Sequence, residues 1–200
     1  MMLFGILISL AGGIFLSYSG LMPSALQPFF DKAPFYCLCV MLILVGYGIG
    51  KDRQAMRTLL NQNLKMLLIP LGTVMGAFIG GVAAVFFLNL GLQECLAVAS
   101  GLGWYSFTAV YLTEVHSAEL GSIAFLANVF REIAGLFLIP LVVRIAGSTP
   151  AISIAGATSM DSAMPVVIKY AGSNAAVTSF IHGVALSVAV PFLVGIIMSF

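Results

Sequence analysis

Charged residues are scarce in this chain. Of its 200 residues, 8% are Asp, Glu, Lys or Arg and 61% are hydrophobic. A soluble domain of this size could not hide that much apolar surface. The formal net charge is +1, so the sequence indicates no nucleic acid and no acidic soluble protein as a partner. The composition therefore predicts an integral membrane protein in contact with lipids.

Cysteine is scarce too, with only three residues, Cys37, Cys39 and Cys95. The C-x-C pair lies in an apolar stretch with no nearby His or second Cys pair, so we interpret all three as small core residues. We predict no metal or cofactor site. Residues 1–16 lack a basic n-region and an A-x-A cleavage site. They are therefore interpreted as a retained membrane helix, not a signal peptide.

Long apolar runs predict the fold, because a helix needs about 20 apolar residues to span a bilayer. We predict an all-α polytopic bundle with two broken, re-entrant segments. Its N-terminal part, residues 1–93, has about three spans, at 1–16, 35–50 and 66–92. Its transport core, residues 94–200, has a hairpin at 95–113, a span at 120–143, a hairpin at 153–167 and a span at 175–200.

The core resembles an internal repeat. A shift of 51 residues aligns the two core spans, and a shift of 55 aligns the two hairpins. The matched pairs include Arg131 with His182, Pro140 with Pro191, Gly101 with Gly156, and Ser106 with Asp161. If each unit crosses the membrane an odd number of times, the copies have opposite orientation, as in many secondary transporters. Chance alignment of two Gly/Pro-punctuated segments is the alternative.

Basic residues predict the orientation. Lys51, Arg53, Arg57 and Lys65 place their loop in the cytoplasm, and the N-terminus with it. If residues 95–113 re-enter rather than cross, Arg144 is also cytoplasmic and the C-terminus lies outside.

Arg131 and Glu132 lie in the middle of the span at 120–143. A charge at that depth costs at least ~2.5 kcal/mol, so it must be paired or line a polar cavity. Neighbours on a helix point about 100° apart and do not pair readily. We predict that Glu132 faces a cavity, where it binds a cationic group or carries a proton. Arg131 either neutralises Asp161 or binds a carboxylate, and Asn128 shares their face.

The hairpins offer binding groups because non-helical backbone at membrane depth must be buried or face water. Half-helix N-termini attract a carboxylate, and free carbonyls attract a cation. Gly101, Gly103 and Gly156 supply conformational freedom. The predicted substrate-binding residues are Glu132, Asp161, Arg131, Asn128, Ser106, Ser159 and Trp104. The alternative for the second hairpin is a solvated loop.

Several roles stay open. His182 is either a proton relay or a core histidine. Glu114 and Glu119 form an outer rim or a solvated loop, and Trp104 stacks on substrate or sits at the membrane interface. A dyad of His182 with Ser159 or Ser162 would make an intramembrane hydrolase. The chain has no nucleophile-elbow motif for this, and we predict no enzyme.

A set of motifs is specific in combination. They are the run from Ala99 to Ser106, Leu112-Thr-Glu114, Asn128 with Arg131-Glu132, Gly156 to Asp161 with Pro165, and His182-Gly183 with Pro191. Together they closely resemble the lysine exporter LysO family over nearly the whole chain. The resemblance implies export of L-lysine and its analogue thialysine across the bacterial inner membrane. It also implies that a carboxylate at the position of Glu132 is required.

The resemblance has one departure, because this chain matches the C-terminal two-thirds of longer members. Those members have another acidic residue in an N-terminal apolar region, whereas Asp31 here lies in a loop. Two explanations are open, a small membrane protein that supplies the missing helices or a homo-oligomer. We favour the first, in which this chain is one subunit of a split transporter. Exporting a cation against the membrane potential also predicts a counter-transported proton on Glu132 or Asp161.

Overall fold

The computed structural model divides into two compact units, residues 1–41 and 42–200. It describes residues 68–200 continuously and scattered positions between 12 and 47. The predicted spans at 1–16 and 35–50 therefore lie outside the described residues, apart from isolated positions in them. The basic loop that carries the predicted orientation lies outside them entirely.

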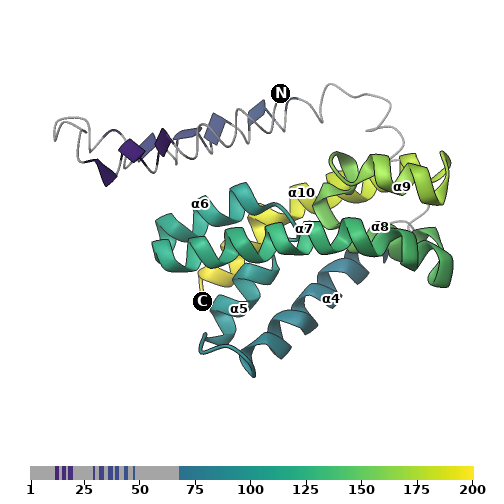
Figure 1. The fold of residues 1–200 in the computed structure, drawn as a ribbon. Helices are drawn as coiled ribbons and strands as arrows, with labels where there is room; N and C mark the ends of the chain where they lie inside the picture. Colours follow the sequence, from purple (N-terminus) through teal and green to yellow (C-terminus); the bar gives the residue numbers. More distant parts are fainter. Residues whose placement is uncertain are drawn as a thin grey trace. The chain divides into compact units, whose positions relative to one another are not determined.

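The regular elements of residues 68–200 are all helices and include no strand, which confirms the all-α prediction. The elements are α4 (Leu68–Val85), α5 (Leu92–Ala99), α6 (Tyr105–Val115), α7 (Ala118–Ala146), α8 (Ser148–Ala155), the 3-10 helix η2 (Gly156–Met160), α9 (Met164–Ala171) and α10 (Ala175–Met198). Figure 1 shows α6 beside the first half of α7, with α8 and α9 at its other end.

Three of these helices are long and apolar enough to cross a membrane: α4, α7 and α10, with 18, 29 and 24 residues. Their outer faces carry large hydrophobic side chains such as Phe130, Phe137 and Phe192, each more than 60% exposed. In a soluble protein such faces would be a liability, whereas lipid tails cover them without cost. The chain is therefore a multi-pass membrane protein.

The ends of α7 follow local sequence. Ser117 is its N-cap, and the Ser117 Oγ accepts a hydrogen bond from the Leu120 N–H at 3.2 Å. The helix stops at Gly147, whose φ of +88° suits glycine. Between these caps the helix runs past Pro140 without ending, so the pair Arg131 and Glu132 lies on continuous helix.

Both predicted hairpin regions are interrupted helices. The first break is residues 100–104, between α5 and α6, and is called the first tip. The second is residues 156–163, between α8 and α9, and is called the second tip. Positive φ values occur at Leu102 (+51°), Gly103 (+97°) and Gly156 (+65°), a region that glycine adopts most easily. The glycines therefore allow the turns.

The two tips touch. The Ala157 N–H donates a hydrogen bond to the Leu102 carbonyl at 2.9 Å. A Cβ on Gly156 would collide with that same carbonyl and with Arg131. The second broken segment is also held by an apolar core with α7 and α10, which includes Ile139, Ile152 and Val167. The tips therefore meet as backbone against backbone, next to α7.

A glycine at the contact between α6 and α7 provides a test of how closely these helices pack. A Cβ on Gly121 would lie 2.7 Å from the Ala109 carbonyl oxygen and would overlap Thr113, whereas one on Gly76 meets nothing within 4 Å. Overpacking costs about 1–3 kcal/mol, so Gly121→Ala should lower the thermal unfolding midpoint in detergent by about 5 °C. Gly76→Ala, the matched control, should not lower it. Equal midpoints for the two variants would show that α6 and α7 are not this close.

Candidate transport site

A cavity of about 220 Å³ opens between the two tips, α6, α7 and α10. Four of the predicted substrate-binding residues line it together, namely Glu132, Asp161, Ser106 and Trp104. The full lining is Gly103, Trp104, Tyr105, Ser106, Glu132, Ala157, Thr158, Met160, Asp161, Ser162 and Ser187. The cavity is therefore the candidate site.

One serine joins the two carboxylates. The Ser162 Oγ donates to Glu132 Oε1 at 2.5 Å and lies 3.4 Å from Asp161 Oδ1. Asp161 Oδ1 also accepts the Ser162 N–H at 2.6 Å. Within residues 68–200, no Lys or Arg forms an ion pair with either carboxylate. This wall of the cavity therefore attracts cations.

Arg131 lies behind the tips rather than in the cavity. A Cβ on Gly103 would be 3.1 Å from its Nη1, and Gly156 is closer still. Nη1 is buried and has no hydrogen-bond partner among the described residues. The structure has no ion pair between Arg131 and Asp161. Of the two predicted roles, the one that neutralises Asp161 is therefore not seen.

Arg131 and Asn128 instead border a separate groove of about 330 Å³ between α4, α5 and α7. Most of its lining is small and apolar, including Gly80, Gly81 and Ala84. The groove is therefore unlike the cavity, which has two carboxylates in its wall.

Asn128 holds the first tip. Its side chain is 2% exposed and does not line the cavity. The Asn128 Oδ1 accepts the Gly103 N–H at 2.8 Å, while Nδ2 donates to the Val98 and Ala124 carbonyls at 3.1 and 2.9 Å. The first of these bonds supplies a partner for the Gly103 N–H, a backbone group that the break in the helix releases. The geometry therefore favours a positioning role for Asn128 over direct substrate binding.

Ser159 and His182 lie apart from the cavity as well. The Ser159 Oγ is 2.9 Å from His182 Nδ1, a distance suited to a catalytic dyad. However, their exposed fractions are 0% and 1%, and neither lines the cavity. A substrate has no path to this hydroxyl in the structure, so the geometry gives the hydrolase alternative no support.

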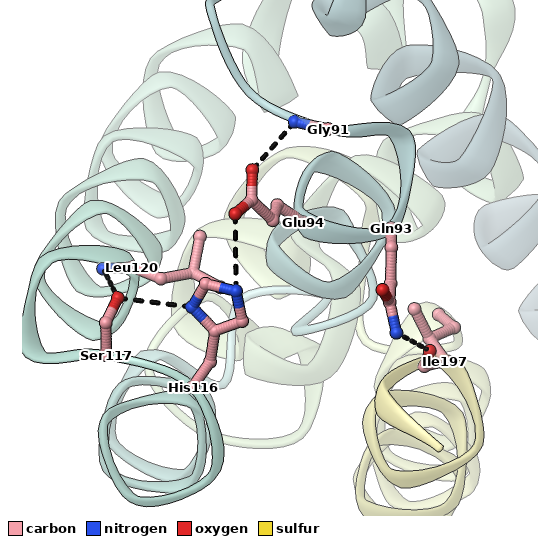
Figure 2. A network of polar contacts seen from close by, with 7 residues as sticks. All are labelled: Gly91, Gln93, Glu94, His116, Ser117, Leu120 and Ile197. Atoms are coloured by element: carbon pink, nitrogen blue, oxygen red, sulfur yellow. Dashed lines mark hydrogen bonds and ion pairs between the residues drawn. The ribbon is translucent and has the colours of Figure 1, made fainter. Parts of the chain in front are cut away.

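The rim residues lie where α6 ends and α7 begins, and Glu114 and Glu119 are exposed there. Beside them is an ion pair that the sequence analysis missed, between Glu94 Oε1 and His116 Nε2 at 3.3 Å (Figure 2). Glu94 also accepts the Gly91 N–H at 2.7 Å, and Gln93 donates to the Ile197 carbonyl at 2.9 Å. These contacts anchor the start of α5 to two neighbouring helices.

Known proteins show where the chain belongs. The family model described as lysine exporter LysO matches residues 7–198. The chain belongs to the lysine exporter LysO family. It is 34% identical over 163 residues to lysine exporter LysO of Escherichia coli, which covers 82% of this chain and 54% of that protein. The family resemblance of the sequence is thereby confirmed.

A second relative has a similar length of match. The chain is 33% identical over 165 residues to a Haemophilus influenzae protein named "Putative lysine exporter", covering 82% of this chain and 84% of that protein. The chain thus spans about half the length of the E. coli relative and most of the H. influenzae one. No solved structure matches it.

The role of Asn128 can be tested by stability. Asn128→Leu keeps the volume but leaves the buried Gly103 N–H without its partner, at a cost of about 1–3 kcal/mol. We expect a thermal midpoint several degrees lower in detergent. The control is Asn174→Leu, at an exposed position. The positioning role fails if both variants unfold at the wild-type midpoint.

Proposed function

We propose that this chain exports L-lysine across the bacterial inner membrane and that the cavity between the tips is its transport site. The observation that carries the proposal is the pair Glu132 and Asp161, joined through Ser162 inside a bundle of apolar helices. Membership of the lysine exporter family supports the choice of substrate. The activity is transport, with no catalytic step.

The groups of lysine match this site. Its two ammonium groups bind the two carboxylates, and the face of Trp104 offers a further cation contact. The positive charge of Arg131 attracts the carboxylate of lysine toward the cavity wall at Gly103 without touching it, because Nη1 is buried behind that residue. Thialysine carries the same charged groups, so the same site accepts it.

We also propose the inverted repeat. Asn128 and Ser179 are related by the 51-residue shift of the two core spans. Asn128 bonds to the first tip at Gly103, and Ser179 Oγ donates to the second tip at the Ser159 carbonyl at 2.6 Å. Each long helix therefore holds the tip of its own unit from an equivalent position. This correspondence supports two copies of one unit, each a re-entrant hairpin followed by a span.

Proton coupling is the proposed driving force. Moving a cation out against an inside-negative potential costs ~2.3 kcal/mol per charge per 100 mV. We assign the proton to Glu132, which is half-buried and reaches the cavity. It then binds either a proton or an ammonium group of lysine, which makes the protein an antiporter. His182 is a poorer carrier because it does not reach the cavity.

A partner completes the proposal. We propose that a separate small membrane protein packs against this chain. The groove between α4, α5 and α7 supports this, because a Cβ on Gly80 in its lining would meet nothing within 4 Å, so another helix can approach closely there. If a second copy of this chain occupies the groove instead, the proposal of a separate partner protein is wrong.

The first test is lysine efflux from preloaded cells that lack their own exporter. Cells expressing the chain with its partner should export L-lysine, and Glu132→Gln or Asp161→Asn should cut the initial rate at least about tenfold, because one ammonium group loses its counter-charge. Glu119→Gln, at the exposed rim, is the matched control and should keep the rate. Efflux by the chain alone would remove the partner. No efflux in any combination would remove lysine as the substrate.

The second test concerns coupling. In right-side-out vesicles loaded with labelled lysine, lowering the external pH from about 7 to 6 raises the proton concentration tenfold. At a clamped membrane potential, the initial efflux rate should then rise severalfold, because proton entry drives lysine exit. A protonophore should abolish the rise, and vesicles without the protein should show none. An efflux rate that ignores the proton gradient would exclude antiport.

A further inference from the structure

A chain of buried polar side chains ties the second tip to two long helices. The Thr73 Oγ1 on α4 is 2.9 Å from His182 Nε2 on α10, and His182 Nδ1 is 2.9 Å from the Ser159 Oγ in the second tip. The three residues are 7%, 1% and 0% exposed. Of these three hydrogen-bonded residues, Thr73 is the one that the sequence analysis did not single out.

A count of donors and acceptors shows which hydrogen-bond arrangements Thr73, His182 and Ser159 can adopt. A hydroxyl has one hydrogen, and a neutral imidazole has one donor and one acceptor nitrogen. In one order Ser159 donates to His182, His182 to Thr73, and Thr73 to the Ile69 carbonyl at 3.1 Å. In the reverse order Thr73 donates first, and Ser159 ends the chain on the Ser179 carbonyl at 2.9 Å.

Either order pairs every group and ends on a main-chain carbonyl. A carbonyl oxygen does not pass a proton on, so a proton could not leave this series of hydrogen bonds at either end. What remains is a mechanical link from α4, through α10, to the second tip.

The link reaches the cavity wall. Thr158 and Met160, on either side of Ser159, line the cavity, whereas Thr73 does not. A Cβ on Gly183 would lie 2.5 Å from the Met160 N, so the second tip is pressed against α10. A shift of Ser159 would therefore displace this part of the cavity wall, which continues with Asp161 and Ser162.

We propose that Thr73 is a positioning residue, which fixes the second tip through His182 and thereby sets the shape of the transport cavity. The inference rests on the proposed function only in naming that cavity the transport site.

Hydrogen exchange measured by mass spectrometry tests the link without any substrate. Thr73→Val keeps the shape and removes the hydroxyl, which leaves His182 Nε2 without its partner. We expect the amides of residues 157–163 to exchange about tenfold faster, the loss typical of one buried hydrogen bond. Thr73→Ser restores the hydroxyl and should exchange like wild type. Thr178→Val, the same change at a half-buried position of α10, is the matched control.

The outcomes separate positioning from general destabilisation. Faster exchange confined to the second tip, with rescue by Thr73→Ser, supports the link. Faster exchange spread evenly over α7 and α10, an equal effect of Thr178→Val, or no rescue by Thr73→Ser overturns it. If Thr73→Val does not fold, Thr73→Cys gives the same comparison with a weaker sulfur partner.

A transport measurement then adds the functional side. Thr73→Val should raise the KM for L-lysine severalfold with a smaller change in maximal rate, because the site is displaced while its carboxylates remain. An unchanged KM in a variant whose tip exchanges faster would overturn the effect on the cavity. If wild type does not transport lysine, the proposed substrate fails, but the exchange result still decides the link.

Discussion

The hydrogen bond between Ala157 N–H and the Leu102 carbonyl expresses the constraint on which the structure depends. Two helical segments break, and each break leaves backbone N–H and C=O groups that need new hydrogen-bond partners. Part of the demand is met by the other tip, and part by Asn128 and Ser179 from the long helices. Because glycines occupy the closest points, the two backbones can approach far enough to bond.

The same constraint explains where the polar chemistry lies. Once the tips are pinned from behind, their other side borders the cavity, and Asp161 and Ser162 are carried there beside Glu132. The helix thus separates two adjacent charges: Glu132 reaches the cavity, whereas Arg131 lies behind the turns. A span with two neighbouring charges can therefore serve two different surfaces of the protein.

Sequence reasoning reached the all-α fold because long apolar runs and glycine-rich interruptions are local signals. It also predicted a shared site for Glu132, Asp161, Ser106 and Trp104, and these four residues line one cavity in the structure. It could not foresee that the Asn128 side chain hydrogen-bonds to the first tip, or that Thr73 contacts a histidine 109 residues away. In an apolar sequence nearly every helix face is hydrophobic, so the pattern does not reveal which face meets which neighbour.

Trp104 is the only tryptophan of the chain, and it lines the cavity. The indole emission of the whole protein therefore comes from one wall of the proposed transport site. Its wavelength and intensity depend on the water and charge around the ring, so the unlabelled protein carries its own optical reporter. A change in the occupancy or hydration of the cavity therefore changes the tryptophan fluorescence of the protein.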